Sequence, residues 1–149
     1  MSRFSVFYCM EFTGYSILLT IPGFGPYIAA RVLASISNPW RFDRSNQVIK
    51  MAGYDLGANR SGKKSDGAVP VISKRGNSEL RYALYQAAHV ASTRNPYFIR
   101  YFTRTLRGRE RERGIKTKMK VKLAAKMLKI AWTLMKKNQG FDPDYLITE

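Results

Sequence analysis

The sequence predicts a mainly α-helical fold, and two observations carry that prediction. The first lies between Leu18 and Ile36, where one helical pattern stops at Ile21-Pro22-Gly23-Phe24-Gly25 and a second begins at Pro26. Proline cannot continue a helix, glycine permits a tight turn, and proline suits the first position of the next helix. The second observation is a helical repeat of apolar residues over 116–137. Together they indicate a helix-hairpin-helix element with additional helices.

The glycine turn has two interpretations. Unpaired N–H groups at the start of a helix, helped by the helix dipole, form a ready seat for a phosphate. On that view Gly23 and Gly25 contact DNA. The alternative is a plain αα-hairpin in which both glycines serve only the geometry of the turn.

Between the hairpin and the middle of the chain, the pattern predicts one short helix. The pair Asn38-Pro39 ends the second helix of the hairpin, because the residue before a proline is pushed out of the helical region. Trp40 and Phe42 are expected to pack back onto the core. Ser45 is expected to cap a helix over residues 46–52, which Gly53 ends.

Two further helices are predicted after residue 77. Asn77 or Ser78 caps the first, whose buried stripe is Leu80, Leu84, Ala87 and Ala91. The second covers residues 116–137 and buries Leu123, Met127, Ile130 and Leu134. Its opposite face carries Lys118, Lys122, Lys126, Lys129 and Lys136. This row of ammonium groups is a candidate DNA-binding surface. The candidate DNA-binding residues are Lys118, Lys122, Lys126 and Lys129.

Charge is the strongest signal in the composition. The 149 residues include 26 Lys and Arg but 10 Asp and Glu, which gives a net charge of +16 and favours a polyanionic partner. A membrane surface is the rival to nucleic acid, but no apolar run approaches the roughly 20 residues that a membrane-spanning helix needs. A single cysteine supports neither a disulfide framework nor a zinc site. We expect a cytoplasmic protein with one structured domain over 17–138, an unassigned segment over 1–16 and a C-terminal tail over 139–149.

A long polar segment, residues 53–77, separates the two halves of the predicted fold. Connections of this length in a compact domain tend to be functional, and Val69 to Ile72 is a candidate short strand. Ser61 is flanked by cations that could surround a DNA phosphate, and Gly62 leaves room for in-line attack by the serine. These cations are Arg60, Lys63, Lys64, Lys74 and Arg75. The alternative is a solvated loop that binds phosphates without chemistry.

Other chemistries find no support in the residues. Gly57 to Lys63 matches the opening of a phosphate-binding loop, but Lys64 stands where Ser or Thr must hold magnesium. A two-metal nuclease needs several converging carboxylates, whereas the acidic residues here are scattered. His89 stands alone on a helix, which favours a structural role. We therefore predict no metal site in this chain.

The order of the motifs resembles one transposase family. The sequence runs IPGFGP, a helix, NPWRF, a short helix ending in MAG, then RSGKK, ISKRGN and LRYAL. This order is similar to the C-terminal transposase domain of the DEDD insertion-sequence family, which includes the Piv-type invertases and the bridge-RNA-guided recombinases. The resemblance covers residues 18–134. It implies that the serine of the S-G pair, Ser61, forms a covalent 5′-phosphoserine link to DNA.

The resemblance also implies parts that this chain does not contain. The family holds Mg²⁺ with four carboxylates in an N-terminal RuvC-like domain, and nothing in the sequence corresponds to that domain. We expect no cofactor in this chain, DNA as its partner, and no strand cleavage by the chain alone. A truncated element or one half of a split protein would explain the difference. A structured guide RNA, a homo-oligomer or a separately encoded N-terminal half are further candidate partners.

Two alternatives to the recombinase remain open from the sequence. One is a stand-alone helix-hairpin-helix protein that binds DNA without sequence preference, through the glycine turn and the lysine face. The other is a basic RNA-binding protein in which Tyr97, Tyr101 and Phe102 stack on bases. At this spacing the same aromatic residues are also typical of a helix packed on the core.

Overall fold

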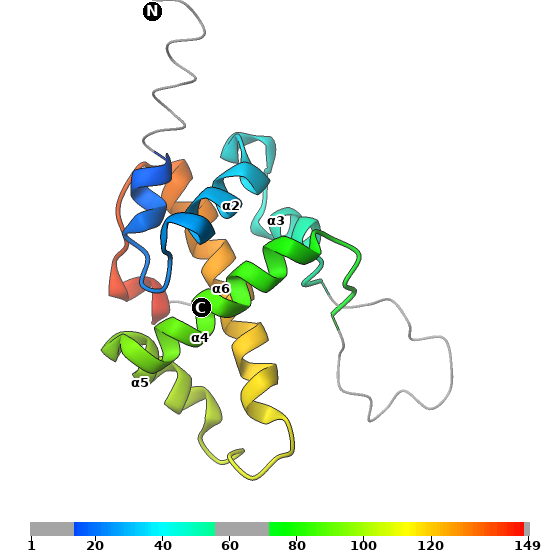
Figure 1. The fold of residues 1–149 in the computed structure, drawn as a ribbon, viewed down its shortest axis with the longest axis vertical. Helices are drawn as coiled ribbons and strands as arrows, with labels where there is room; N and C mark the ends of the chain where they lie inside the picture. The colour runs from blue at the N-terminus through cyan, green and yellow to red at the C-terminus, as the bar shows by residue number, and fades with distance from the viewer. Residues whose placement is uncertain (1–13, 56–71, 148–149) are drawn as a thin grey trace, which may run out of the picture.

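A computed structural model describes residues 14–55 and 72–147 of the chain (Figure 1). A helix over residues 14–19 is followed by α2 (Pro26–Ile36), η1 (Pro39–Arg41), α3 (Ser45–Ala52), α4 (Ser78–Arg94), α5 (Pro96–Leu106), α6 (Ile115–Lys137) and η2 (Pro143–Leu146). The fold is mainly helical, which confirms the predicted fold class.

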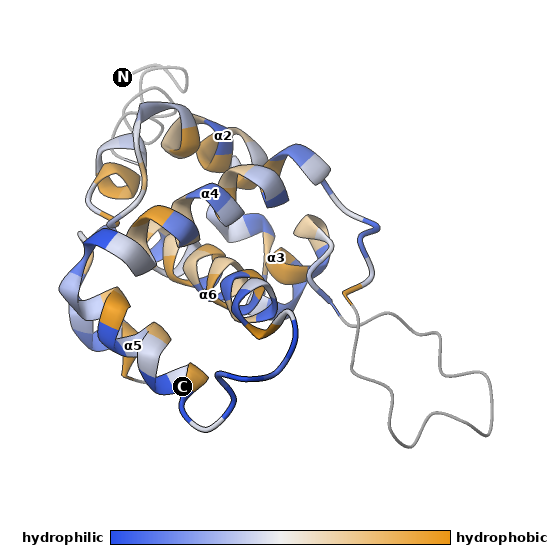
Figure 2. Ribbon diagram, turned by 60° about the horizontal axis from the view of Figure 1, so that its bottom comes forward, coloured by the Kyte–Doolittle hydropathy of each residue, from blue (hydrophilic) through white to orange (hydrophobic). Residues whose placement is uncertain are grey.

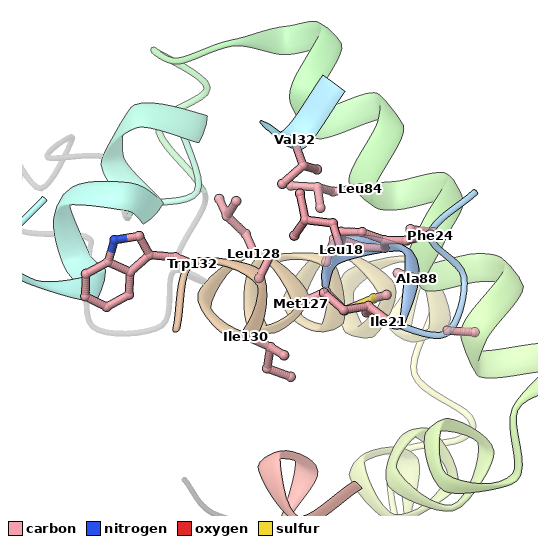
Figure 3. Close-up of a cluster of buried hydrophobic side chains, with 14 of the residues drawn as sticks. Leu18, Ile21, Phe24, Val32, Leu84, Ala88, Met127, Leu128, Ile130 and Trp132 are labelled. Atoms are coloured by element: carbon pink, nitrogen blue, oxygen red, sulfur yellow. The ribbon is translucent and has the colours of Figure 1, made fainter. Parts of the chain in front are cut away.

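Helix α6 is the centre of the fold. It packs against α2, α3, α4, α5 and η1, and its apolar side is buried among them. Figure 3 shows Met127 and Leu128 of this helix on the side that faces the N-terminal hairpin and α4, whereas Ile130 points to the opposite side. The predicted stripe is confirmed, since its four residues are at most 4% exposed. Burial of this broad face excludes water from a single continuous core.

The predicted turn and its second helix are present, and the turn packs closely on α4. Helix α2 begins at Pro26, and Gly23 adopts a φ of +89°. A Cβ atom at Gly23 would lie 2.5 Å from the Ala87 carbonyl oxygen of α4, which is closer than real Cβ contacts. Gly23 therefore has two structural requirements, a left-handed backbone and a close helix approach. Gly25 has neither, because its φ is −86° and a Cβ there would meet nothing within 4 Å.

The start of α3 differs from the prediction. Ser45 is the first helical residue rather than the cap. The Gln47 side chain instead accepts hydrogen bonds from the backbone N–H groups that precede the helix. The Gln47 side-chain oxygen accepts from the Asp43 N–H at 2.7 Å. The predicted end of the helix is confirmed, because Gly53 is left-handed with a φ of 78°. Helix α4 begins as predicted, with the Asn77 side chain accepting from the N–H of Leu80.

The expectation that Trp40 packs onto the core is wrong, whereas Phe42 packs against the core as predicted. The Trp40 side chain is 59% exposed, whereas Trp132 of α6 is buried and its Nε1 donates to the Pro39 carbonyl at 2.9 Å. The Lys136 ammonium lies 4.8 Å from the ring centroid of Trp40 and 4.4 Å from that of Trp132. Trp40 thus covers a cation at the surface, and the α6 tryptophan fills the interior position.

The region predicted as a C-terminal tail packs against the helical core. Phe141 stacks on Phe98 of α5 with ring centroids 5.6 Å apart, and its N–H donates to Thr20 Oγ1 at 2.9 Å. Leu146 is 3% exposed, and its carbonyl accepts from the Lys126 ammonium. In Figure 1 this red segment passes from the end of α6 down beside the first helix towards α5. Residues 139–147 therefore form one wall of the fold.

Candidate functional site

The predicted nucleophile lies outside the described residues. Ser61, Arg60, Lys63 and Lys64 all belong to residues 56–71, so their roles stay predictions. Most of the candidate strand from Val69 lies there too. The structure does define where this segment begins and ends, together with the remaining predicted residues.

The two ends of the segment are held together by backbone and side-chain hydrogen bonds. We call residues 53–55 and 72–77 the loop base. The Ser73 N–H donates to the Asp55 carbonyl at 2.6 Å, and the Ser73 hydroxyl donates to the Asp55 carboxylate at 2.6 Å. The Lys74 N–H donates to the Gly53 carbonyl at 3.0 Å. The chain therefore enters and leaves residues 56–71 at one fixed place.

Two glycines let the two chain segments of the loop base approach this closely. A Cβ atom on Gly76 would lie 2.2 Å from the Met51 carbonyl oxygen and 2.3 Å from the Gly53 nitrogen. A Cβ on Gly53 would lie 2.6 Å from the Gly76 nitrogen. Neither position has room for a side chain, because the nearest neighbouring atom in each case belongs to the backbone and cannot move aside. The glycines of MAG and KRG thus serve one contact across the loop base.

Arg81 and Tyr54 fasten the loop base to α4. The Arg81 guanidinium donates to the Ala52 carbonyl at 3.0 Å, at the end of α3 where the helix dipole favours a cation. The Tyr54 hydroxyl donates to the Arg81 carbonyl at 3.2 Å. Burial raises the pKa of Tyr54 well above its ordinary value of 10.0, although nearby Arg81 acts in the opposite direction. Both ends of residues 56–71 are consequently fixed to the helical core.

Sequence reasoning missed these fastening residues. Asp55, Tyr54 and Arg81 make contacts with residues 18, 27 and 29 positions away, respectively. Such contacts carry no periodic signal, because they depend on how α3 and α4 meet. The short spacing from the helix-ending glycine to Tyr54 and Asp55 was the available hint that this corner of the chain is ordered.

Two of the predicted DNA-binding cations stand on the loop base itself. Lys74 and Arg75 are both exposed, and Lys74 has a φ of 57°. Within residues 14–55 and 72–147, the recorded ion pairs are Arg31–Glu79 and Arg109–Glu112, so no carboxylate there neutralises these two cations. An anion that approaches the end of residues 56–71 meets their charge directly.

The predicted lysine face of α6 divides into exposed and engaged residues. Lys118, Lys122 and Lys129 are exposed to solvent. Lys126 is half-buried, and its ammonium donates to the Leu146 carbonyl at 3.3 Å and lies 4.7 Å from the Tyr101 ring centroid. The C-terminal segment therefore covers part of this face, and the DNA-binding role of all four lysines stays a prediction.

The predicted sites are divided between two helices. Gly23 and the loop base both contact α4, at Ala87 and Arg81, which are about 9 Å apart along the helix axis. The lysine face belongs to α6. The structure therefore places the hairpin turn and the serine segment on the same helix, while the lysines form a separate surface.

The described residues offer little to a metal ion. Across residues 14–55 and 72–147, no three side chains of His, Cys, Asp or Glu lie together in a way that could hold one. His89 is exposed, and its Nδ1 lies 2.9 Å from the Lys120 ammonium. In the same ranges, no helix combines the length and the apolar character required to span a membrane.

Comparison with known families identifies the class of this chain. The sequence model described as the transposase IS116/IS110/IS902 family matches residues 15–103, which is more than half of the chain. The chain therefore belongs to that family, and its membership implies DNA as a partner. No match was found among the curated proteins. The matched residues run from the first helix through the loop base and α4 into α5, whereas the whole of α6 follows them.

Proposed function

We propose that this chain is the DNA-binding transposase domain of an insertion sequence and that Ser61 is its nucleophile. The observation that carries the proposal is the loop base, which fixes both ends of residues 56–71 beside two exposed cations. Membership of the transposase family supplies the partner. A segment anchored in this way loses less conformational freedom when it orders on DNA than one whose ends are free.

The reaction at Ser61 would be a transfer of a DNA phosphate to a hydroxyl. The serine oxygen attacks phosphorus as the bond from phosphorus to the 3′ oxygen breaks. The serine gives up its proton, the 3′ oxygen gains one to become a hydroxyl, and the 5′ phosphate stays on the serine. Cations stabilise the charge that develops on the phosphate oxygens. Lys74 and Arg75 at the loop base, with Arg60, Lys63 and Lys64, would supply them.

We also propose that this chain binds DNA but does not recombine it alone. The described residues do not fit a magnesium site, as the donor groups are not gathered. The Mg²⁺ of the reaction would belong to a RuvC-like domain in a separately encoded half. A structured guide RNA and a homo-oligomer remain further proposed partners.

Covalent capture of DNA tests the nucleophile. The full chain is mixed with a RuvC-like domain of the same transposase family, Mg²⁺ and DNA labelled on its 5′-phosphate side. We expect the label to remain on the protein in a denaturing gel. Ser61→Ala should abolish this product, whereas Ser65→Ala, a serine in the same basic segment, should retain it. Capture by the Ser61→Ala chain would contradict the proposal.

The exposed lysines of α6 favour a second candidate function. Lys118, Lys122 and Lys129 form a charged surface outside the family match. A stand-alone helix-hairpin-helix protein that binds DNA or RNA without sequence preference would use that surface. On this view Ser61→Ala changes neither binding nor any covalent product, so the capture experiment separates the two functions.

A further inference from the structure

A pocket lies between α5 and the C-terminal segment, away from the loop base. Its volume is about 380 Å³, which is at the small end of the ~300–1,000 Å³ typical of small-molecule sites. Its lining residues are Tyr97, Arg100, Tyr101, Arg104, Pro143, Asp144, Leu146 and Ile147. The pocket is thus bounded by aromatic and aliphatic side chains, with two arginines on one side and a carboxylate on the other.

The lining of the pocket includes an exposed aromatic residue. Tyr97 is 50% exposed, whereas Phe98 and Tyr101 of the same helix are buried and Phe102 is partly buried. Ile147 on the opposite side is 67% exposed. A tyrosine left open beside an aliphatic side chain offers a flat apolar slot, and a nucleobase is a planar group that stacks in such a slot.

Arginines continue from the pocket along α5. Arg100 and Arg104 are four residues apart on one side of α5, Arg107 follows directly after the last helical residue, and all three are exposed. Residues 100–122 contain ten Lys and Arg but two Glu, which is half of the net charge of the whole chain. Figure 2 shows the connection from α5 to α6 as a continuous hydrophilic stretch. The positive side chains of residues 100–122 could therefore bind a phosphate backbone that starts at the pocket.

We propose that this pocket and the arginine row bind a single strand of nucleic acid. One unpaired base stacks on Tyr97 inside the pocket, and the neighbouring phosphates contact Arg100, Arg104 and Arg107. The arginines lie on the α5 side of the pocket, so the backbone runs along α5. A duplex does not fit this arrangement, because its bases are stacked within the helix. The site is separate from Ser61 and does not depend on the proposed reaction.

Binding of short labelled oligonucleotides to the full chain tests the site. Fluorescence anisotropy at fixed salt compares a single-stranded DNA, the same sequence as RNA, a hairpin duplex, and an abasic strand with the same number of phosphates. We expect Tyr97→Ala to weaken binding of the single strands about tenfold. Tyr97→Phe should retain the affinity, since the ring remains. Tyr82→Ala, which removes a tyrosine 64% exposed on α4, should have no effect.

The abasic strand isolates the role of the base. We expect it to bind equally to the parent chain and to Tyr97→Ala, because it has nothing to stack. Replacing Arg100 and Arg104 with Gln should weaken all the strands and reduce the slope of affinity against salt by about two. Preference for the DNA or the RNA strand identifies the source of the strand, and either one supports the site.

Three results would overturn this inference. The first is that Tyr97→Ala and the parent chain bind a normal strand with equal affinity. The second is that Tyr97→Ala weakens binding of the abasic strand as much as binding of the normal strand. The third is that the duplex binds more tightly than the single strand and in a way that depends on Tyr97. Tyr97→Ala should still support Ser61-dependent capture of DNA. Capture that persists in Ser61→Ala would contradict the proposed nucleophile alone, whereas unchanged binding of the normal strand by Tyr97→Ala would contradict the strand site alone.

Discussion

Two glycines at the loop base leave no room for a side chain. A methyl group at position 76 would meet three backbone atoms of the Met51–Gly53 corner within 2.5 Å. We expect Gly76→Ala to lower the free energy of unfolding by about 1–3 kcal/mol, because the two chain segments of the loop base must separate. Gly140→Ala is the matched control, since its nearest contact would be an ordinary 3.6 Å. Urea unfolding of both variants measures the difference, and equal stabilities would contradict the close contact.

Tyr54 gives the loop base a dependence on alkaline pH. Burial raises the pKa of its hydroxyl in the folded chain above the unfolded value of 10.0. The unfolded chain therefore loses this proton first as the pH rises. The stabilisation is fully present below about pH 10 and is lost as the pH rises towards the folded pKa.

Urea unfolding between about pH 8 and about pH 11 tests that dependence. We expect the parent chain to lose stability above about pH 10 more steeply than Tyr54→Phe, which has no hydroxyl to titrate. The variant should be slightly less stable at neutral pH, because it lacks the hydrogen bond to the Arg81 carbonyl. Parallel pH profiles for the two chains would show that burial of Tyr54 does not control this loss.

Among the elements, the helices with strong local signals could be predicted and the contacts between them could not. Pro26, Asn77 and the α6 stripe follow from proline geometry, side-chain capping and helical periodicity, which are set by neighbours in the sequence. The cap of α3 was assigned to Ser45, but Gln47 reaches back to the preceding N–H groups and takes that role. The sequence alone does not show whether Ser45 or Gln47 makes the capping hydrogen bond.

The sequence predicts the cations of the candidate site by residue type, but it does not predict the hydrogen bonds that hold the loop base. The cations Lys74 and Arg75 were recognised from charge, whereas the Ser73–Asp55 and Arg81–Ala52 contacts arise from the meeting of α3 with α4. The same limit explains Trp40. Both tryptophans are apolar, and only the packing of η1 on α6 decides which one is buried.

Helix α6 follows the family match, yet the matched helices pack around it. Leu128 is fully buried at the centre of this helix. We expect Leu128→Ala to lower the free energy of unfolding by about 2–5 kcal/mol, through lost burial and the cavity that remains. Lys122→Ala, an exposed change on the same helix, should shift it by less than about 0.5 kcal/mol. Denaturant unfolding followed by circular dichroism measures both, and equal shifts would contradict the central position of α6.

For the whole molecule, charge is distributed over three surfaces with different roles. The loop base carries Lys74 and Arg75 beside the ends of the serine segment, α6 carries exposed lysines, and the arginine row leads from the pocket on α5. The core beneath them is a single cluster of buried residues from every major helix. A rigid helical body with several cationic surfaces can hold DNA at more than one point while one segment reaches the reacting phosphate.

The most direct test of this account is whether DNA lies against position 61 of the intact chain. Ser61→Cys in a Cys9→Ser background accepts a thiol-linked photocrosslinker, and Leu19→Cys, on the exposed side of the first helix, serves as the control. With labelled duplex DNA, we predict strong crosslinking from position 61 and little from position 19, with the crosslinks lost at high salt. Equal crosslinking from both positions, or none from position 61 when DNA is bound, would contradict the claim that the loop base delivers this segment to DNA.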